Sequence, residues 1–525
     1  MNTKINKTAR DAAFIFLVAT LFSFVFSTYV SYTWDELPYI LSGIKYIRWF
    51  KELAFLTITK ESIINYWQIT QEHPPFVKVW MGIFIEIFQE KIGLLNAARI
   101  SISIIHGIFC TITFLFFSKI YSRKFSIIFL FIINTLPRFL GYSSICIMDY
   151  PIAIFWFLFA IFFYRVDKNL KYLIICIILF GMLNLTKFTG ILAIIPAFIW
   201  AVIFKRKIIL KRTPLIFITG ILFIVLFWPW MYVSTANKIQ HYFWLNIGRA
   251  FEIDLNKDKM DFPTKKPASL VKVKYFGKIF NDTNKNKTPW HYPLIMVLIT
   301  IPIPILIFSL IGLFANIRNK DDPLITISFV NLLFFILFFA LPFIPKYAGV
   351  RNFLFVYPFV ALLGTYGAMY IADNRNIKNN FKIMIFFMLI IGGLSSLYSS
   401  RELLINYYNI NFSEKFNADA IGFHLSGVEG TINEETINYI NSNLPQNSSI
   451  SMHPVEPYIM MLYSNNSPFR KDIKVVNDSH NANYLIIFNQ KEFWDAHDTK
   501  LFNTQAPLYS CIINKIKVHG LYKQN

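Results

Sequence analysis

Long apolar stretches alternate with short polar ones over the first 400 residues of the chain. A helix needs about 20 mostly apolar residues to cross a bilayer, so the pattern predicts a polytopic α-helical membrane protein. About eleven spans are expected, near residues 12–31, 99–118, 125–136, 150–164, 172–186, 190–204, 213–231, 293–315, 323–343, 353–371 and 383–399. The first stretch is long and no small-residue cleavage site follows it, so we expect a span rather than a cleaved signal.

One apolar segment does not fit this scheme. Residues 76–90, "FVKVWMGIFIEIFQE", are short for a span and include Lys78 and Glu86. Their apolar positions recur at helical spacing, which is typical of a helix lying in the membrane interface. The segment is therefore predicted to be an interfacial helix within a first outer loop, residues 32–98.

Basic residues orient the predicted bundle. The chain carries a net charge of +21 although only 15% of its residues are charged and 55% are hydrophobic. With a cytosolic N-terminus, the basic residues gather in the loops of one side, as the positive-inside rule predicts. Membrane-flanking loops then account for the charge without a nucleic-acid partner. This parity places Asp35 on the outer face.

The amino-acid composition of the chain changes at about residue 401. The segment 401–525 is polar and Asn-rich, and "IKVV" and "ANYLIIF" are typical of short buried strands. We expect two parts: a transmembrane domain over 1–400, and a small α/β domain over 401–525 on the outer side. The outer loop 232–291 is long enough to hold helices of its own. The four cysteines show no metal or disulfide spacing.

Ionisable residues collect near the outer ends of the predicted spans. Ionisable groups at membrane depth are costly and usually functional, although a single charge at a helix end is more often a solvated anchor. Together they supply an acid, a base and cations suited to phosphate. The candidates are Asp35, Glu36, Glu72, His73, Arg138, Asp149, Lys187, His291, Lys346 and Arg351.

Several motifs occur in an order that resembles a known family. They are "WDE" (34–36), "EHPPFVK" (72–78), "ARISIS" (98–103), "SSICIMDYP" (143–151), "NLTKFTG" (184–190) and "YAGVRNFLFVYPFVALLGTYG" (347–367). This order is similar to that of the protein O-mannosyltransferases and the bacterial aminoarabinose transferases, which are membrane GT-C glycosyltransferases. The segment 347–367 resembles bacterial members of glycosyltransferase family 39 especially closely. The resemblance covers roughly residues 10–370, and residues 401–525 show no comparable match.

The resemblance implies roles for individual residues. Asp35, with Glu36 beside it, would be the catalytic carboxylate, and Asp149 would be the family's second Asp. Arg351 would bind the lipid phosphate. Glu72 would be the zinc-binding acidic residue of the aminoarabinose transferases, and His73 stands where those enzymes have Lys. The lumenal MIR domain of the mannosyltransferases is not recognisable here, so protein mannosylation is not implied.

The implied reaction needs few groups. A sugar on a polyprenyl phosphate already has an activated leaving group, so no nucleotide or redox cofactor is required. Asp35 would take the acceptor proton while cations stabilise the departing phosphate, and one base without a second nucleophile favours single displacement with inversion. Lys346 and Arg351 are the first cation candidates, followed by His73, Arg138 and Lys187.

The expected partners are therefore a polyprenyl-phosphate sugar and a hydroxyl acceptor on a lipid, glycan or protein. The sequence itself gives no direct sign of a metal. The Ile-, Asn-, Lys- and Phe-rich composition points to an AT-rich genome and a bacterial inner membrane, with the site on the periplasmic side.

A second class of function stays open. A polytopic transporter or lipid-sugar flippase would also have many spans and intramembrane charges. Transporters usually show internal repeats and polar residues near the bilayer midplane, and neither is evident in this sequence. A non-catalytic scaffold that holds a lipid-linked sugar is a third reading, which the two carboxylates Asp35 and Asp149 disfavour.

Overall fold

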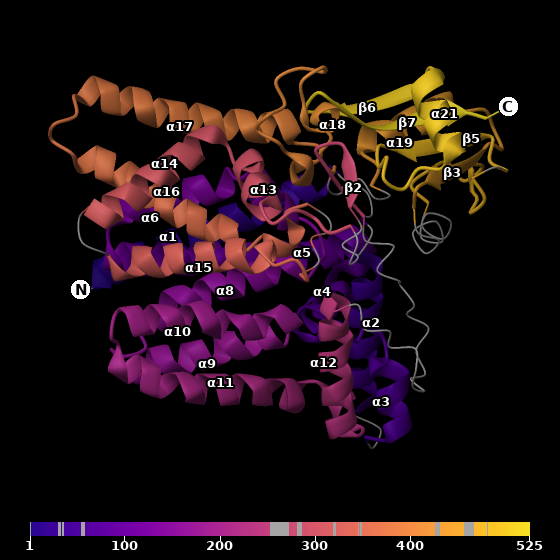
Figure 1. Cartoon of the computed structure of the whole chain (residues 1–525). Helices are drawn as coiled ribbons and strands as arrows, with labels where there is room; N and C mark the ends of the chain where they lie inside the picture. Colours follow the sequence, from indigo (N-terminus) through magenta and orange to yellow (C-terminus); the bar gives the residue numbers. More distant parts are fainter. Residues whose placement is uncertain are drawn as a thin grey trace.

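The computed structural model describes residues 2–29, 33, 36–53, 58–251, 272–280, 286–318, 322–344, 346, 349–425, 431–455, 467–479 and 481–524. A bundle of apolar helices forms its larger part (Figure 1). Its helices are α1 (Asn2–Ser27), α5 (Leu94–Ile120), α6 (Arg123–Asn134), α7 (Pro137–Tyr142), α8 (Asp149–Phe163), α9 (Leu170–Asn184), η1 (Phe188–Ala193), α10 (Ile194–Ile203), α11 (Lys207–Phe227), α13 (Tyr292–Thr300), α14 (Ile303–Arg318), α15 (Pro323–Ala340), α16 (Val356–Asp373) and α17 (Asn379–Ser400).

Every predicted span falls on one of these helices or on a consecutive pair. Within the described residues, five helices are long and apolar enough to cross a membrane, and a bent pair brings the number to six. Three further apolar helices are shorter: Asp149–Phe163, Leu170–Asn184 and Phe188–Ile203. The chain is thus a polytopic integral membrane protein, while the count of eleven spans stays a prediction.

The span expected at 293–315 is not one helix. It consists of α13 and α14, whose axes are bent by 117° at the break between them. Ile301, just before Pro302, has an extended backbone. A residue that precedes proline is pushed out of the helical region, and the proline itself lacks an N–H donor. The pair Ile301-Pro302 therefore ends α13 and precedes α14.

Short helices cover one end of the bundle. They are α2 (Glu36–Leu53), α3 (Lys60–Trp67), α4 (Phe76–Ile92), η2 (Pro229–Tyr232) and α12 (Thr235–Phe251). In Figure 1, α2, α3 and α12 stand across the long helices rather than along them. The predicted interfacial helix at 76–90 is α4, and loop 232–291 contributes α12. A Cβ on Gly43 would lie 2.5 Å from the carbonyl oxygen of Lys78, so α2 and α4 cross closely only because Gly43 has none.

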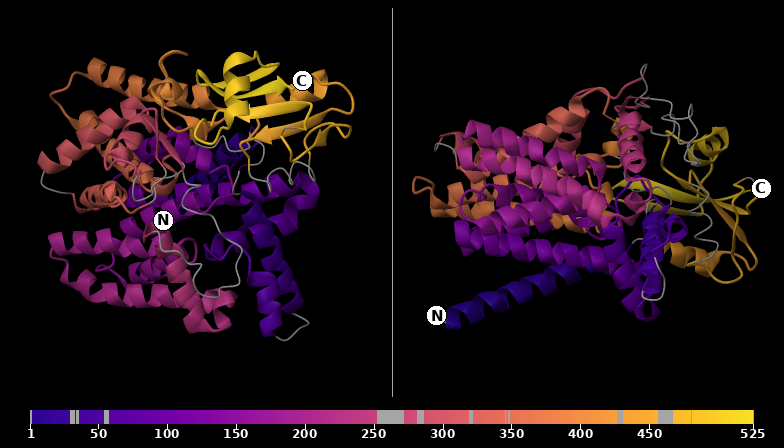
Figure 2. Two further views of the ribbon diagram at one scale, coloured as in Figure 1. Left: turned by 45° about the vertical axis from the view of Figure 1, so that its right-hand side comes forward. Right: turned by 90° about the horizontal axis from the view of Figure 1, so that it is seen from below.

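A five-stranded sheet lies at the same end of the molecule (Figures 1 and 2). Its strand order is β4-β3-β5-β7-β6, with β4, β3 and β5 parallel and β5, β7 and β6 antiparallel. The expected strands at "IKVV" and "ANYLIIF" are β4 and β5. The elements of this part are η6 (Leu404–Asn406), α18 (Ala418–Ile421), α19 (Glu434–Asn443), β3 (Ser449–His453), β4 (Lys474–Val475), β5 (Tyr484–Phe488), α21 (Ala496–Thr504), β6 (Tyr509–Ile513) and β7 (Ile516–Lys523).

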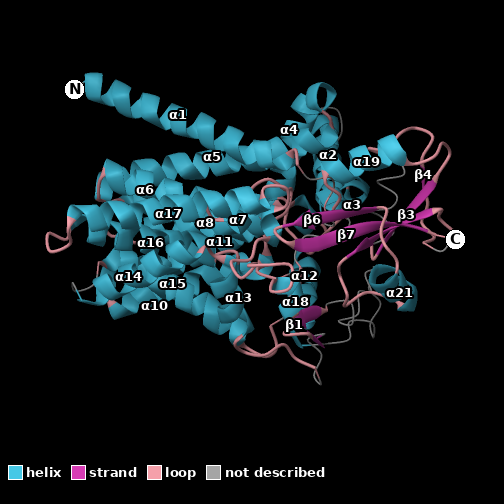
Figure 3. Ribbon diagram, turned by 90° about the horizontal axis from the view of Figure 1, so that it is seen from above, coloured by secondary structure: helices cyan, strands magenta, loops and turns pink. Residues whose placement is uncertain are grey.

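A small hairpin joins this sheet region to the bundle. Strands β1 (Val273–Tyr275) and β2 (Lys278–Phe280) pair with each other and precede α13. The N–H of Gly277 donates to the carbonyl oxygen of Gly422 at 3.0 Å, and Lys274 pairs with Asp419 at 3.1 Å. Figure 3 shows the sheet beside α18 and far from the N-terminus of α1.

Candidate functional site

Three of the candidate residues meet at the covered end of the bundle. The Nζ atom of Lys187 donates to Oδ1 of Asp149 at 2.5 Å, and Nε of Arg351 donates to Oδ2 at 2.8 Å. The Asp149 side chain is 3% exposed, while Lys187 and Arg351 are 14% and 19% exposed. One carboxylate thus holds two cations at an edge that solvent still reaches. The trio carries one net positive charge.

Local structure explains why these three residues converge. Asp149 is the first residue of α8, Lys187 directly precedes η1, and Arg351 begins the short helix η5 (Arg351–Phe353) between α15 and α16. Each residue therefore lies at the start of a helical segment rather than within a span. A guanidinium and an ammonium placed together are suited to an anionic ligand, above all a phosphate, which accepts hydrogen bonds from both.

Glu36, expected beside the catalytic carboxylate, is fully buried and all its acceptor sites are occupied. Its Oε1 accepts from Nε of Arg99 at 2.8 Å and from the N–H of Cys146 at 2.9 Å. Its Oε2 accepts from Nη2 of Arg99 at 2.6 Å and from the N–H of Thr33 at 2.9 Å. These four bonds fill the lone-pair sites of a carboxylate. Burial acts to raise the pKa of Glu36, but the Arg99 guanidinium outweighs it and holds the pKa below its usual value.

This buried ion pair acts as a clamp. Arg99 also donates from Nη1 to the carbonyl oxygen of Ser27 at 2.8 Å, so the clamp joins the end of α1, the start of α2, α5 and the chain before α8. Asp35 itself lies outside the described residues. Thr33, two residues before Asp35, and Glu36, directly after it, are both held by the clamp. We therefore interpret Glu36 as a positioning residue rather than a catalytic one.

Lys78 stabilises the "EHPP" turn by hydrogen bonds to its residues and to Thr70. This side chain is fully buried, and its Nζ donates to the carbonyl oxygen and hydroxyl of Thr70, both at 2.8 Å, and to the carbonyl oxygen of His73 at 2.5 Å. Burial lowers the pKa of Lys78 to about 7, with the Glu72 carboxylate acting in the opposite direction. Sequence reasoning noted Lys78 only as a charge in an apolar segment.

The same turn adjoins the trio. The N–H of Phe76 donates to the carbonyl oxygen of Leu185, two residues before Lys187, at 3.0 Å. Glu72 and His73 are half-buried on this turn, and the His73 ring lies 5.7 Å from that of Tyr39. The "EHPP" turn of the first outer loop therefore contacts the segment of the chain that carries Lys187.

Two predicted substrate-binding residues, Arg138 and Lys346, have hydrogen bonds to backbone carbonyl groups, and their substrate-binding role stays a prediction. Nε of Arg138, in α7, donates to the carbonyl oxygen of Tyr407 at 2.8 Å, and its guanidinium lies 4.3 Å from the centre of the Tyr408 ring. Nζ of Lys346 donates to the carbonyl oxygens of Leu341 and Ile344, at 2.9 and 3.0 Å. Arg138 thus ties the chain after α17 to the bundle, and Lys346 caps the chain after α15. Neither side chain contacts Asp149.

A polar contact next to the site escaped the sequence analysis. His106, within the apolar helix α5, contacts the hydroxyl of Tyr150 through Nδ1 and the side-chain oxygen of Asn134 through Nε2, the latter at 2.9 Å. All the sequence offered was a lone histidine between isoleucines and glycine, which is more often a satisfied buried residue than a site. Tyr150 follows Asp149, so this contact helps to hold the start of α8.

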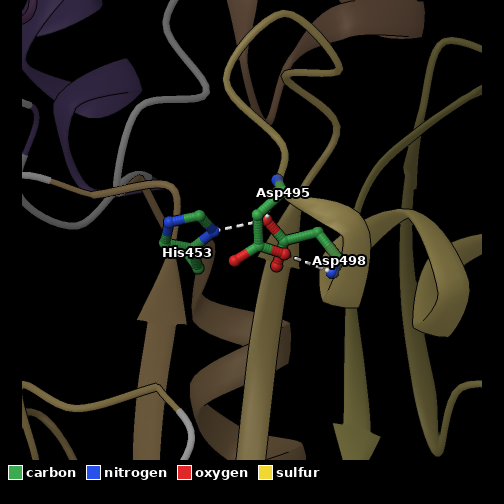
Figure 4. Close-up of side chains that lie close together, drawn as sticks. All are labelled: His453, Asp495 and Asp498. Carbon is green, nitrogen blue, oxygen red and sulfur yellow. Dashed lines mark hydrogen bonds and ion pairs between the residues drawn. The ribbon is translucent and has the colours of Figure 1, made fainter.

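The metal-type side chains that lie close together in the described residues do not include Glu72. Among the described residues, one group of three lies close enough to hold an ion: His453, Asp495 and Asp498, whose ligand atoms are all within 4.8 Å of one another (Figure 4). A structural explanation accounts for this group, because Asp495 and Asp498 form the capping box of α21 and His453 contacts Asp498. Zinc at Glu72 stays a prediction.

Comparison with known proteins agrees with this architecture. The family model described as "Dolichyl-phosphate-mannose-protein mannosyltransferase" matches residues 72–232, a range that contains the "EHPP" turn, Asp149 and Lys187. The solved structure of ArnT from Cupriavidus metallidurans, bound to undecaprenyl phosphate, superposes with a TM-score of 0.50 at 12% identity over 97% of each chain. The chain has the GT-C glycosyltransferase fold and is similar to family 39.

Further similarity to GT-C structures is weaker. The apo oligosaccharyltransferase of Archaeoglobus fulgidus has a TM-score of 0.47 at 11% identity, over 91% of this chain and 69% of that one. No curated protein sequence matches the chain. The resemblance to GT-C glycosyltransferases that the motif order predicts is confirmed by the family model and by the fold of ArnT. The roles of the site residues rest on their own geometry.

Proposed function

We propose that the protein transfers a sugar from a polyprenyl-phosphate donor to a hydroxyl acceptor at the outer face of the membrane. The observation that carries the proposal is the placement of Lys187 and Arg351 on one buried carboxylate, Asp149, at the end of a GT-C bundle. ArnT, which shares this fold, was solved with undecaprenyl phosphate. A lipid phosphate fits two cations at a membrane boundary because its tail enters the bilayer while its charge stays at the edge.

In this proposal Lys187 and Arg351 bind the donor phosphate and stabilise it as it leaves. Asp149 holds the two cations side by side, where they would otherwise repel each other. A carboxylate that already accepts from two cations is a poor proton acceptor, so Asp149 orients the cations and does not act as the base. Preorganised cations at the site of developing charge lower the barrier without moving during the reaction.

Asp35 is proposed as the base that takes the acceptor proton. This role rests on the resemblance and on the clamp, which holds Glu36 directly after Asp35 and Thr33 two residues before it. With one base and no second nucleophile, the sugar would pass directly from phosphate to acceptor with inversion at the anomeric carbon. No cofactor is required for these steps, and Glu72 remains the residue to test for zinc.

The decisive experiment is glycosyl transfer by purified protein in proteoliposomes that contain polyprenyl-phosphate sugars. Comparing the mass spectra of cell-envelope glycans and lipids with and without the protein identifies the sugar and the acceptor. The alternative function, a transporter or lipid-sugar flippase, predicts movement of the lipid-sugar between leaflets with no new glycosidic bond. Transfer without such movement supports the proposal, and movement without transfer overturns it.

A double-mutant cycle tests the trio itself. If Asp149 and Lys187 act as a unit, Asp149→Asn and Lys187→Gln lower kcat/KM singly but less than additively in combination, with a coupling of about 1–3 kcal/mol. Lys168→Gln, on an exposed loop beyond α8, serves as the matched loss of one lysine charge. Additive losses would mean that Lys187 and Asp149 act independently, and the proposed phosphate site would be wrong.

We propose further that residues 401–525 face the same side as Asp35 and either cover the site or select the acceptor. Protease added outside intact spheroplasts should then cut within 401–525. The segment 316–322, from the last turn of α14 to the residue before α15, should be protected. A protein truncated before this segment should still bind the lipid donor but lose transfer to its natural acceptor. Cleavage of 401–525 only from the cytosolic side would overturn the orientation.

A further inference from the structure

A groove opens between α6 and α17 at the end of the bundle away from the sheet. Its volume is about 520 Å³, and its lining residues are Arg123, Lys124, Ile127, Ile128 and Phe386. Apart from the two basic side chains, the walls are apolar. Neither the trio nor the clamp contributes to it.

The position of the groove relative to the candidate site follows from α1. Arg123 pairs with Asp11, near the start of α1, at 3.0 Å, while Arg99 binds Ser27 at its end. These two positions are about 24 Å apart along a helix that rises 1.5 Å per residue. This distance approaches the thickness of the hydrocarbon core of a bilayer. The basic residues of the groove thus lie near the opposite membrane boundary from the trio.

The side chains along the groove change from basic to apolar at a spacing of one helical turn. Arg123 and Lys124 each lie four residues before an isoleucine of the lining, Ile127 and Ile128, and so share a face with it. On α17, Lys382 likewise lies four residues before Phe386, and its Nζ donates to the carbonyl oxygen of Ala372 at 2.8 Å. From the end of the bundle inward, every wall of the groove runs from a cation to an apolar side chain.

We propose that this groove binds an anionic phospholipid, with the headgroup phosphate at Arg123 and Lys124 and the acyl chains against Ile127, Ile128 and Phe386. Every apolar face of a spanning helix contacts lipid chains. This groove differs because two cations lie one helical turn toward the boundary, where the phosphate of such a lipid is found. Asp11 neutralises part of the charge of Arg123, while Lys124 in the lining and Lys382, one turn before Phe386, leave the mouth basic.

The test is native mass spectrometry of protein released from membranes of phosphatidylglycerol and phosphatidylethanolamine. The wild-type protein should retain phosphatidylglycerol in preference. The Arg123→Gln/Lys124→Gln variant should retain roughly tenfold less, since each cation near the surface contributes about 1 kcal/mol and one of them is partly paired. Lys168→Gln/Lys171→Gln removes two exposed lysines, one from the loop between α8 and α9 and one from the first turn of α9, and should retain the wild-type amount.

A second variant separates lipid binding from a folding defect. Ile128→Trp fills the groove and leaves both charges in place, so it should also lose the lipid while the thermal melt of the protein in detergent is unchanged. Equal retention by all variants would overturn the proposal. So would preferential retention of phosphatidylethanolamine or of added polyprenyl phosphate. The assay contains no sugar donor, so its outcome does not depend on the glycosyl-transfer proposal.

Discussion

Asp149 and Arg351 are 202 positions apart in the sequence, yet Nε of Arg351 donates to the Asp149 carboxylate at 2.8 Å. The contact joins the start of α8 to the loop between α15 and α16. It therefore links two distant parts of the chain at the mouth of the bundle. The other oxygen of Asp149 is occupied by Lys187, so neither cation can be changed without affecting the charge of the whole trio.

Arg351→Ala should weaken use of the lipid-phosphate donor. Loss of one partner of a buried charge pair costs about 2 kcal/mol or more, which corresponds to a fall in kcat/KM of ~30-fold. Arg351→Lys should recover only part of it, because an ammonium cannot form two parallel bonds to a phosphate. The measurement is the dependence of the transfer rate on donor concentration.

Arg318→Ala is the matched control. Arg318 is the exposed last residue of α14. In Figure 1, α14 runs toward the end of the bundle that is away from the sheet. Its loss should leave kcat/KM for the donor unchanged. Equal effects of the two substitutions would show that Arg351 does not meet the donor.

Glu36→Gln should destabilise the protein rather than abolish the chemistry selectively. It leaves the Arg99 guanidinium buried without a counter-charge, which costs about 3 kcal/mol. A thermal melt in detergent should therefore shift well below that of the wild type. Glu86→Gln is a useful comparison, because its partner Lys51 is exposed and such surface pairs contribute little. An unchanged melt for Glu36→Gln would mean that the clamp is not formed.

Asp35→Asn should lower kcat while donor binding stays within about twofold of the wild type, since general-base catalysis contributes about 10²–10⁴-fold to rate. The amide keeps the shape of the side chain but cannot accept the proton. Single-turnover rates and donor binding, measured separately, distinguish the two effects. Near-normal turnover would remove Asp35 as the base.

Much of the fold could be read from the sequence because burial in lipid imposes a simple rule. A backbone surrounded by hydrocarbon must satisfy its own hydrogen bonds, so long apolar stretches become helices. The break between α13 and α14 was missed because the apolar pattern runs straight through it. The signal was Pro302, but prolines are also tolerated within spanning helices, so its presence alone did not decide.

The site was only partly predictable. The motif order brought out Asp149, Lys187 and Arg351 as candidates, but it did not show that they touch. Arg138 and Lys346 looked equivalent to them, because a cation near a span end has the same sequence pattern whether it binds a ligand or a backbone carbonyl. Only the fold separates the two cases.

The His453–Asp498 pair predicts a pH dependence in the C-terminal sheet region. The hydrogen bond that Nδ1 of His453 donates to the Asp498 carboxylate raises the pKa of His453 above its ordinary value of 6.5. Protonated His453 is thus favoured in the folded state, so this stabilisation is fully present below about pH 6.5 and is lost as the pH rises through the folded-state pKa. Below about pH 6.5 the α21 amides of the wild type should exchange more slowly than those of His453→Asn. This difference should shrink as the pH rises through the folded-state pKa. Identical pH profiles for the two proteins would contradict this linkage.

Lys78→Met should disturb the "EHPP" turn without changing the overall fold. The substitution removes three donors and leaves the carbonyl oxygens of Thr70 and His73 without that partner in a buried setting. Each such loss costs about 1–3 kcal/mol. Because this turn adjoins Lys187 through the Phe76–Leu185 hydrogen bond, the loosened turn should lower kcat for glycosyl transfer as well as the melting temperature.

Lys45→Met separates this effect from the loss of a positive charge in the first outer loop. Lys45 is exposed on α2, one turn from Trp49 and on the opposite side from the crossing with α4, so its removal should leave kcat and the melt unchanged. Lys78→Arg keeps the charge but cannot place its larger planar group among the three acceptors, and it should resemble Lys78→Met more than the wild type. If Lys78→Arg behaved as the wild type, charge alone would be required at this position, and the three short donor bonds would not be what holds the turn.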